Sequence, residues 1–531
     1  MTAHPFSPAG RQAALAAMAD REHDLLIVGG GVTGCGLARE AALRGLSVAL
    51  VERDDFGCGT SGRSSKLIHG GLRYLAYGDF RMVREAARER HVLRQIAPHL
   101  VHPLPFLMPI WTGYAKYRLA LWLFDLLAGA GPSERHRILD AQEVAERLPG
   151  VQTKGLKGGL LYGEYVTDDA RLTLENALSA AEHGALVANH ARAVTLDHER
   201  GRVVGATICD ELTDQVYRVK ARLTVNATGP WAAHTLGVSG LAAPKALFPS
   251  KGIHLLFAAE RLPIQGAVAL NAPSGRAGFA IRRWGYVYVG TTDDPYDGPL
   301  DSPTADSKSV GALLALVQEC FPALHLTRAD ILGTWAGLRP LIAEPGKTAR
   351  DTSRHDEVWA GPDGLLTVAG GKLTTYRPMS RRVMTCVQAA LRMPPDADAG
   401  RSATVPLPGA GAPVSLDIDP QAQERIAWLY GARTRNLQAM GAEWLAPLAP
   451  GVPVLRGEVR LAVEQEMALT LTDFLDRRSS LLLFSPDHGL AAAEAAAGLM
   501  GDLLGWTASE QARQLDRYRM AAGAHGLPTA E

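Results

Sequence analysis

The chain has 531 residues, which exceeds the ~250–300 residues at which a single hydrophobic core usually stops growing, so we expect two or three domains. It carries 55 Lys and Arg against 55 Asp and Glu, and this zero net charge does not support nucleic-acid binding. Its five cysteines are scattered without metal-site spacing, and no apolar run reaches the ~18 residues of a membrane span. We therefore expect a cytoplasmic protein with no metal site and no membrane span.

The first informative segment is a strand, a glycine-rich turn and a helix near the N-terminus. Gly29-x-Gly31-x-x-Gly34 follows an apolar strand over residues 24–28 and opens the helix. Glycines permit the tight turn and the close approach of a pyrophosphate, which the helix N-terminus then binds. Glu52 ends the next strand, 23 residues after Gly29, where an acid binds the adenosine ribose. This unit predicts a site for FAD or NAD.

Two later glycine turns favour FAD over NAD. Val225-Asn-Ala-Thr-Gly229 ends a strand in small residues, and Ala369-Gly-Gly-Lys-Leu-Thr-Thr375 repeats the order of strand, glycines and helix. Taken singly, each could be an ordinary turn between a strand and a helix. Three such turns in one chain indicate an extended dinucleotide that passes several strand ends.

The segment Ser64–Leu75 places cations and an imidazole around a pair of glycines, shortly after the first turn. Lys66, His69, Arg73 and Tyr74 are its polar side chains with the most obvious chemistry. Together they indicate an anionic substrate that is held against the cofactor.

Several blocks of the sequence match one family of flavoproteins. They are Ile27-Val-Gly-Gly-Gly-Val-Thr-Gly34, Thr60-Ser-x-x-Ser-Ser-Lys-Leu-Ile-His-Gly-Gly-Leu-Arg-Tyr-Leu75, Asp168-Asp-Ala-Arg-Leu172, Val225-Asn-Ala-Thr-Gly-Pro-Trp231, Lys251-Gly-x-His254, Gly290-Thr-Thr-Asp293, Gly337-Leu-Arg-Pro-Leu341, Gly370-Gly-Lys-Leu-Thr-Thr-Tyr-Arg377 and, near the C-terminus, Glu464, Thr470, Asp473 and Leu475-x-Arg477-Arg478. From about residue 24 to about residue 520, the chain resembles the FAD-dependent, aerobic glycerol-3-phosphate dehydrogenases of bacteria and mitochondria. These enzymes belong to the D-amino-acid-oxidase-like group.

The resemblance implies an α/β fold with three parts: a Rossmann-like FAD-binding domain, a mixed-sheet substrate domain of the D-amino-acid-oxidase type and a C-terminal α-helical domain. The expected limits are an N-terminal extension at 1–23, an FAD-binding domain at 24–101, 155–245 and 331–392, a substrate or cap domain at 102–154 and 246–330, a linker at 393–416 and a helical domain at 417–531. The Pro- and Gly-rich composition of residues 393–416 also predicts a linker by itself.

The resemblance further implies oxidation of sn-glycerol 3-phosphate to dihydroxyacetone phosphate. A hydride would pass from C2 to N5 of FAD, and the electrons would then pass to a membrane quinone. The residues expected to bind FAD are Gly29, Gly31, Gly34, Glu52, Ser64, Ser65, Lys66, His69, Gly70, Thr228, Gly229, Gly371, Lys372, Leu373 and Thr374. A soluble oxidase that reduces O2, an amino-acid or amine oxidase and a non-enzymatic flavin-binding sensor are the alternatives.

Two arginines are expected to bind the substrate phosphate. Arg73 and Arg339 suit this role because a guanidinium is permanently charged and donates two parallel hydrogen bonds. Arg73 could instead pair with a structural acid, and Arg339 could brace the turn before Pro340. Thr291, Thr292 and Tyr74 are the candidate hydroxyl donors to the substrate.

The expected general base is His254, since an imidazole with a pKa of ~6.5 accepts a proton near neutral pH. His69 is the rival, although its position also suits packing against the flavin. A lone histidine in a strand is otherwise most often a packed side chain. Lys372 is expected to stabilise the reduced flavin or a developing alkoxide; its alternative is a surface lysine at a helix start.

Residues 111–127 mix aromatic, basic and apolar side chains, which is typical of a helix that lies in the headgroup plane of a membrane. A buried helix that covers the substrate domain fits the same pattern. Because the resembled family passes electrons to membrane quinone, we expect peripheral attachment to the inner face of the cell membrane. The sequence leaves a homo-oligomer open.

Overall fold

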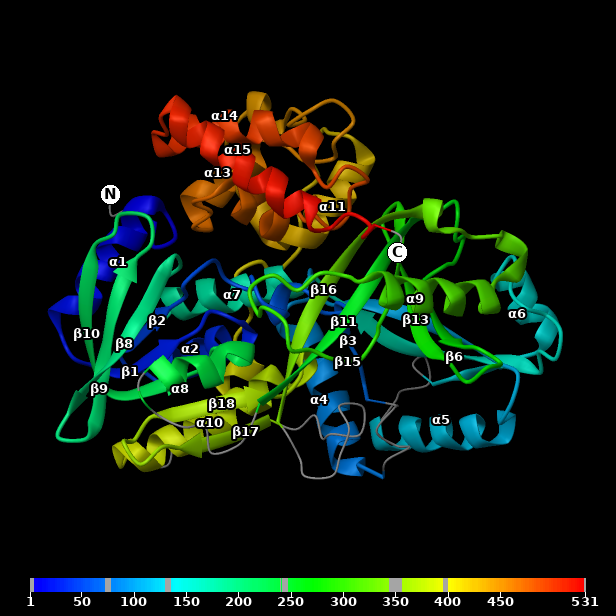
Figure 1. The fold of residues 1–531 in the computed structure, drawn as a ribbon, viewed down its shortest axis with the longest axis horizontal. Helices are drawn as coiled ribbons and strands as arrows, with labels where there is room; N and C mark the ends of the chain where they lie inside the picture. Colours follow the sequence, from blue (N-terminus) through cyan, green and yellow to red (C-terminus); the bar gives the residue numbers. More distant parts are fainter. Residues whose placement is uncertain are drawn as a thin grey trace.

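The computed structural model describes residues 4–71, 78–128, 135–238, 240, 247–342, 356–394 and 400–529. In these residues two β-sheets lie side by side, and a helical C-terminal region lies above both of them (Figure 1). Among the same residues, no helix combines the length and the apolar character needed to cross a membrane.

The first sheet is the dinucleotide-type sheet that the N-terminal motif predicts. Its strands are β1 (His23–Val28), β2 (Val48–Val51), β7 (Leu186–Ala188), β8 (Ala191–Glu199), β9 (Arg202–Asp210), β10 (Val216–Asn226), β17 (Asp356–Ala360) and β18 (Leu366–Gly370). The order is β17-β18-β10-β1-β2-β7, and the five strands from β18 to β7 run parallel. β1 and β2 are almost wholly buried, as expected for parallel strands covered on both faces.

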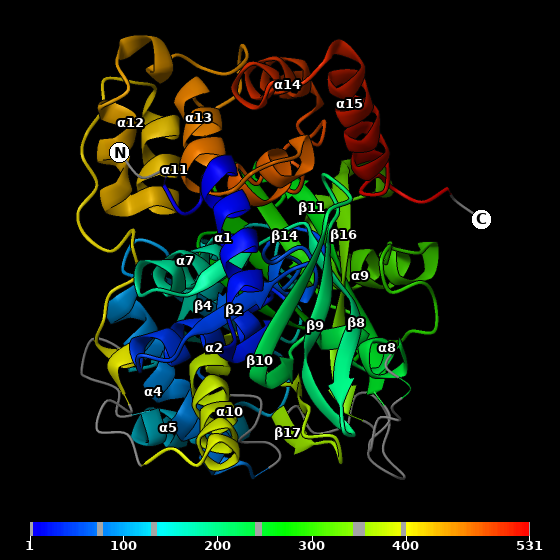
Figure 2. The ribbon, with the colours of Figure 1, turned by 90° about the vertical axis from the view of Figure 1, so that its left-hand side faces the viewer.

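Helices cover both faces of this sheet. One group consists of α2 (Val32–Leu43), α7 (Asp169–Glu182) and α10 (Tyr376–Leu391), in which α2 packs against both of the others. On another side, α1 (Pro8–Asp20) stands against β7 and β10 (Figure 2). Ser7 caps α1, and Arg11 forms a buried ion pair with Asp210 of β9. The N-terminal segment is therefore part of the packed structure.

The second sheet is mixed. Its strands are β3 (Leu67–Ile68), β4 (His102–Ile110), β5 (Arg137–Leu139), β6 (Gly158–Val166), β11 (Leu247–Ala258), β12 (Ala267–Asn271), β13 (Ala277–Arg283), β14 (Tyr286–Gly290), β15 (Asp294–Pro295) and β16 (Ile331–Ile342). β12 and β4 run parallel, and the other paired strands are antiparallel. β6 pairs with β3, β4 and β5, and β16 pairs with β11, so both strands belong to this sheet. The expected domain limits instead group their residues with the FAD-binding domain.

Further helices border the second sheet and connect it to the first. They are α4 (Phe80–Ile96), α5 (Tyr114–Ala128), α6 (Ala141–Arg147), α8 (Ala232–Val238) and α9 (Ser307–Cys320). Both ribbon views place α4, α5 and α10 at the bottom of the molecule, away from the C-terminal region (Figures 1 and 2).

The C-terminal region is helical, as the sequence predicts. Its helices are α11 (Pro420–Tyr430), α12 (Thr434–Gln438), α13 (Arg456–Gln465), α14 (Leu490–Leu504) and α15 (Ala508–Gly523). Buried ion pairs join it to the rest of the chain: Arg477 and Arg478 pair with Asp55, and Arg171 pairs with Glu466. Removing one partner of such a buried pair costs about 3–5 kcal/mol, so these pairs fix the helical region in place.

Candidate active site

The glycine turn after β1 has a geometry that side chains would obstruct. Gly29 has a φ of +113°, and a Cβ on Gly34 would lie 1.9 Å from the carbonyl oxygen of Gly29. The N-terminus of α2 follows directly, and the amide of Val32 donates to Ser61 Oγ at 2.9 Å. The turn therefore leaves bare backbone and a helix start facing the space beyond β1, as a pyrophosphate requires.

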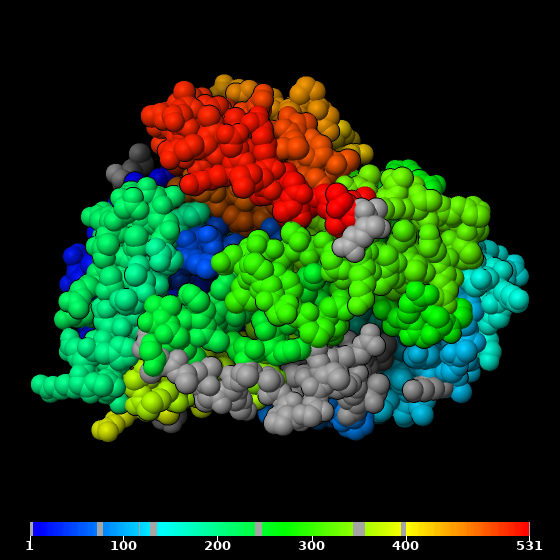
Figure 3. Space-filling model, in the orientation of Figure 1, coloured from blue at the N-terminus to red at the C-terminus, as the bar shows by residue number. Residues whose placement is uncertain are grey.

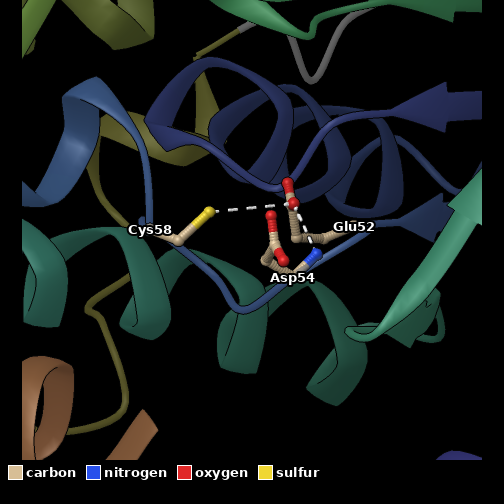
Figure 4. Close-up of side chains that lie close together, drawn as sticks. All are labelled: Glu52, Asp54 and Cys58. Carbon is tan, nitrogen blue, oxygen red and sulfur yellow. Dashed lines mark hydrogen bonds between the residues drawn. The ribbon is translucent and has the colours of Figure 1, made fainter. Parts of the chain in front are cut away.

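Glu52 lies beside this turn at the end of β2. Its carboxylate accepts hydrogen bonds from the amides of Gly30 (2.6 Å) and Asp54 (3.0 Å), and burial raises its pKa. Cys58 Sγ approaches the same carboxylate at 3.9 Å (Figure 4). Glu52, Asp54 and Cys58 are close enough to share one cation. Burial also raises the pKa of the Cys58 thiol well above its usual value. The contacts observed among these three residues are hydrogen bonds to Glu52.

A cavity of about 670 Å³ opens beside the turn and is lined by both sheets. The side that we call the Rossmann wall is formed by Gly29, Gly31, Glu52, Thr228 and Gly229. The side that we call the cap wall is formed by Gly252, His254, Thr291 and Arg339. Figure 3 shows a hollow in one face of the molecule, between the teal lobe of β8–β10 and the green lobe of the second sheet, with blue N-terminal segments at its bottom.

The cavity brings together most of the residues that the sequence predicts. Those that line it are Gly29, Gly31, Glu52, Ser64, Ser65, His69, Thr228, Gly229, His254, Arg339, Gly371, Lys372, Leu373 and Thr374. Gly34, Lys66, Gly70 and Thr292 do not line it. Arg73 and Tyr74 lie outside the described residues.

Lys66, which is expected at the cofactor, does not line the cavity. Its ammonium forms a buried ion pair with Asp169 and also donates to the carbonyl of Gly62 at 3.4 Å. Asp169 also accepts hydrogen bonds from the amide and hydroxyl of Ser64, at 2.9 and 2.7 Å. The charge of Lys66 is therefore neutralised next to the cavity, and its observed contacts hold the segment in place.

His254 lies on β11 and is almost wholly buried, with 2% of its surface exposed. Its Nε2 is 3.0 Å from Ser65 Oγ, and its ring stacks on Trp335 at 4.7 Å between centroids. Burial, helped by the charges of Arg339 and Lys66, lowers its pKa well below 6.5. The lowered pKa favours the neutral imidazole, which has a lone pair for a proton, and it also makes this ring a weaker base than a free histidine.

Arg339 is held firmly on β16, which pairs with β11. Its Nη1 is 3.1 Å from Asp293, and its Nη2 donates to Thr291 Oγ1 at 3.0 Å and to the carbonyl of Thr292 at 3.1 Å. A Cβ on Gly252 would lie 2.4 Å from the same Nη2, so this glycine makes room for the guanidinium. The hydroxyl of Thr292 accepts from the amide of Ile253 at 3.2 Å. Thr292 thus positions Arg339 through its carbonyl, and its hydroxyl, which accepts from Ile253, keeps its own proton to donate.

Two segments close the space between the walls. The amide of His69 donates to Thr374 Oγ1 at 3.2 Å, which ties the His69 segment to the last glycine turn. Gly370 and Gly371 have φ values of +79° and +82°, and they bring Lys372 to the cavity. The sequence therefore predicts correctly that these distant segments meet.

Many residues that line the cavity are absent from the predicted set, and three of them make polar or ring contacts that matter for the site. Glu164 of β6 accepts from the amide of Gly70 at 2.7 Å, and burial raises its pKa. Trp231 lines the cavity from the turn after β10, and Arg63 lines it while paired with Asp476 at 2.7 Å. A lone acid in the apolar run of β6 is the one signal that could have revealed Glu164. No sequence signal could have revealed Arg63, because its partner Asp476 is 413 residues away.

The residues present fit a flavin dinucleotide. The Rossmann wall supplies bare backbone, a helix start and a ribose-type acid, while the cap wall supplies a neutral imidazole and a guanidinium. Such a site can hold an anionic substrate beside a redox cofactor and take one proton from it.

Comparison with known proteins supports this interpretation. A model of the FAD dependent oxidoreductase family matches residues 24–377, and a model of the C-terminal domain of alpha-glycerophosphate oxidase matches residues 400–511. The aerobic glycerol-3-phosphate dehydrogenase of Bacillus subtilis strain 168 is 37% identical over 537 residues, which cover 97% of this chain and 96% of that protein. The enzyme of the same name from Staphylococcus aureus strain USA300 is 36% identical over 514 residues, 92% of each chain.

A solved structure shows the same architecture. The glycerol-3-phosphate dehydrogenase of Bacillus halodurans, complexed with FAD, superposes with a TM-score of 0.82 at 32% identity and covers 99% of this chain and 100% of that one. The predicted α/β fold, with its FAD-binding and mixed sheets and its helical C-terminal domain, and the predicted FAD cofactor are confirmed. The chain therefore belongs to the family of FAD-dependent glycerol-3-phosphate dehydrogenases.

Proposed function

We propose that this chain oxidises sn-glycerol 3-phosphate to dihydroxyacetone phosphate and passes the electrons to a membrane quinone. The relatives named above support the substrate. The observation that carries the proposal is that neutral His254 and the fixed guanidinium of Arg339 face the same cavity as the dinucleotide turn.

The roles of the side chains follow from their charge and position. Bound FAD supplies the hydride acceptor. His254 takes the proton of the C2 hydroxyl, because its lowered pKa keeps the ring unprotonated. Arg339 binds the substrate phosphate; Arg73 and Tyr74, which lie outside the described residues, are proposed to join this contact on the resemblance alone. Lys372 places a positive charge where the alkoxide develops.

Anaerobic reduction of the flavin tests the substrate. Purified holoenzyme is mixed with glycerol 3-phosphate, glycerol, lactate or D-alanine, and the flavin absorbance is followed by stopped flow. We expect bleaching by glycerol 3-phosphate alone, because the other three lack the phosphate that Arg339 would bind. Bleaching by D-alanine or lactate, or none by glycerol 3-phosphate, would contradict the proposal. Rapid H2O2 formation in air, without a quinone, would contradict the proposed acceptor.

The proposed membrane contact is α5, which carries an apolar stripe on its outer face. Leu119, Trp122 and Leu126 lie three and four residues apart and are 65%, 60% and 65% exposed. Leu121 and Phe124 on the opposite face are buried. The helix thus both covers the second sheet and presents apolar side chains outward, so the two interpretations of residues 111–127 apply to different faces.

Basic side chains are exposed on α4, the helix that packs on α5. Arg81, Arg84 and Arg88 border a groove with Arg381 of α10, which Glu85 and Glu89 also line. Apolar side chains beside arginines suit the boundary between acyl chains and anionic headgroups. Together they support peripheral attachment to the inner face of the cell membrane.

Sedimentation with vesicles tests this contact. We expect Trp122→Glu combined with Leu126→Glu to abolish binding of the holoenzyme to vesicles of phosphatidylglycerol and phosphatidylcholine. Leu212→Glu changes an exposed leucine outside α5 and should leave binding intact. Phe124 is unsuitable for this test because it is buried. Equal binding by the double variant and the wild type would exclude α5 as the contact.

A further inference from the structure

A cluster of three side chains joins the two parts of the chain that enclose the cavity. Trp231 Nε1 donates to Asp301 at 2.8 Å, and Arg53 forms an ion pair with the same carboxylate oxygen. The guanidinium of Arg53 lies 4.7 Å from the centre of the Trp231 ring. Arg53 and Trp231 both line the cavity and belong to turns of the first sheet. Asp301 belongs to the loop between β15 and α9 of the second sheet.

The stem of that loop is fixed to the strand that carries His254. Lys251 of β11 pairs with Asp306 at 2.8 Å and donates to the carbonyl of Thr304 at 3.1 Å. Its ammonium also lies 5.4 Å from the centre of the Tyr296 ring. Residues 296–306 are therefore anchored on the second sheet, while Asp301 reaches the first.

The cluster sits where the nucleotide part of the cavity is open to solvent. Arg53 follows Glu52 directly, and Trp231 packs on the glycine loop next to Cys58, where a Cβ on Gly59 would lie 2.9 Å from the indole ring. The side chains of Arg53 and Asp301 are 34% and 67% exposed. An exposed ion pair alone contributes little to stability. Here, however, the Asp301 carboxylate also accepts a hydrogen bond from the indole of Trp231, and the guanidinium of Arg53 also lies on that ring.

We propose that Asp301 is a positioning residue that holds Arg53 and Trp231 closed over the nucleotide part of the cavity and thereby slows the release of FAD. The side chain acts on the cofactor through its two partners. The inference uses the cofactor of the family and is independent of the proposed substrate and acceptor.

The rate of FAD release tests the proposal. Holoenzyme is diluted rapidly, and the fluorescence of the released FAD is followed at low salt and in 1 M NaCl. We expect Asp301→Ala to release FAD about five- to tenfold faster than wild type at low salt, since the one carboxylate that holds both Arg53 and Trp231 is lost, while the pair of Arg53 with Asp54 remains. High salt should accelerate release from the wild type and leave the variant nearly unchanged, because an exposed ion pair weakens when the Debye length falls to about 3 Å in 1 M salt.

Two further variants separate a latch from a general loss of structure. Asp297→Ala removes an exposed acid of the same loop and should release FAD at the wild-type rate. Asp301→Asn keeps an acceptor for Trp231 and should release FAD at a rate between those of the wild type and Asp301→Ala. This variant also tests the proposal if Asp301→Ala fails to fold. The proposal is overturned if Asp301→Ala or Asp301→Asn, once folded, releases FAD at the wild-type rate, or if Asp297→Ala accelerates release equally.

Discussion

The two walls of the cavity are built on different principles. The Rossmann wall is mainly backbone: its decisive feature is the absence of side chains at Gly29, which lines it, and at Gly34 behind it, where a Cβ would strike a carbonyl oxygen. The cap wall is made of side chains held by other side chains, as Arg339 is held by Thr291 and Asp293. The first wall is therefore sensitive to added atoms, and the second to removed ones.

This difference follows from how each wall is assembled. The first turn and Glu52 lie within 24 residues of sequence, so one βαβ unit forms most of that site. His254, Thr291 and Arg339 come together only when β11 pairs with β14 and β16. The predictions that follow test whether the two walls are functionally separable.

The largest expected effect is on the cap wall, at His254. We expect His254→Ala to lower kcat/KM for glycerol 3-phosphate by about 10²–10⁴, the usual effect of losing a general base, with FAD content unchanged. Stopped-flow flavin reduction and the flavin-to-protein absorbance ratio measure the two quantities. His69→Ala is the matched comparison; a larger loss of reduction rate there would move the base to His69.

Arg339→Ala should weaken substrate binding by about 2–5 kcal/mol, because a charge-assisted contact with the phosphate is lost. FAD binding should change far less. Steady-state kinetics give kcat/KM, and equilibrium dialysis gives the FAD affinity. Arg339→Lys keeps the charge but loses the fork and should fall between alanine and wild type. An unchanged kcat/KM in the alanine variant would refute the assignment.

Gly34→Ala instead disturbs the glycine turn that supports the Rossmann wall. A Cβ placed 1.9 Å from the Gly29 carbonyl forces the helix away from the turn, and overpacking of this kind costs about 1–3 kcal/mol. We expect reduced FAD content in the purified protein and a lower free energy of unfolding of the apoprotein. Gly45→Ala is the control, because a Cβ there meets no atom within 4 Å, although its φ of +79° carries some strain. Full FAD content in Gly34→Ala would contradict the role of the turn.

The smallest effect concerns the back of the cap wall, where His525 Nδ1 lies 2.9 Å from the carbonyl of Thr334 on β16. Burial lowers the pKa of His525 to about 4. In the unfolded chain this histidine therefore binds more protons than in the folded chain between pH 6.5 and 4. Over this range the free energy of unfolding falls as the pH falls. Between pH 7 and 5.5 this amounts to about 1 kcal/mol for one histidine.

His525→Gln should remove that part of the pH dependence. Urea unfolding of both proteins at pH 7 and 5.5 measures it, and the comparison uses the change with pH rather than absolute stability. The same loss of stability in both proteins would show that His525 does not contribute.

The sequence predicts the Rossmann wall better than the cap wall. Gly29, Gly34 and Glu52 were predictable because a local turn determines their geometry. Lys66 was assigned to the cofactor, yet its partner Asp169 lies 103 residues away and could not be identified by spacing. Thr292 does not line the cavity: its hydroxyl accepts from the amide of Ile253 and its carbonyl from Arg339, and these partners, 39 and 47 residues away, could not be identified by spacing either.

Helix α5 links the outer surface of the molecule to the cavity within one helix diameter. Phe124, on its inner face, packs so closely on Gly70 that a Cβ there would lie 2.5 Å from the ring, and Gly70 lies between His69 and Gly71, which line the cavity. For protein production this has a practical meaning. Excising α5 to obtain a better-behaved sample would remove the support beneath the His69 segment, so solubility is better improved by changing Leu119, Trp122 and Leu126 alone.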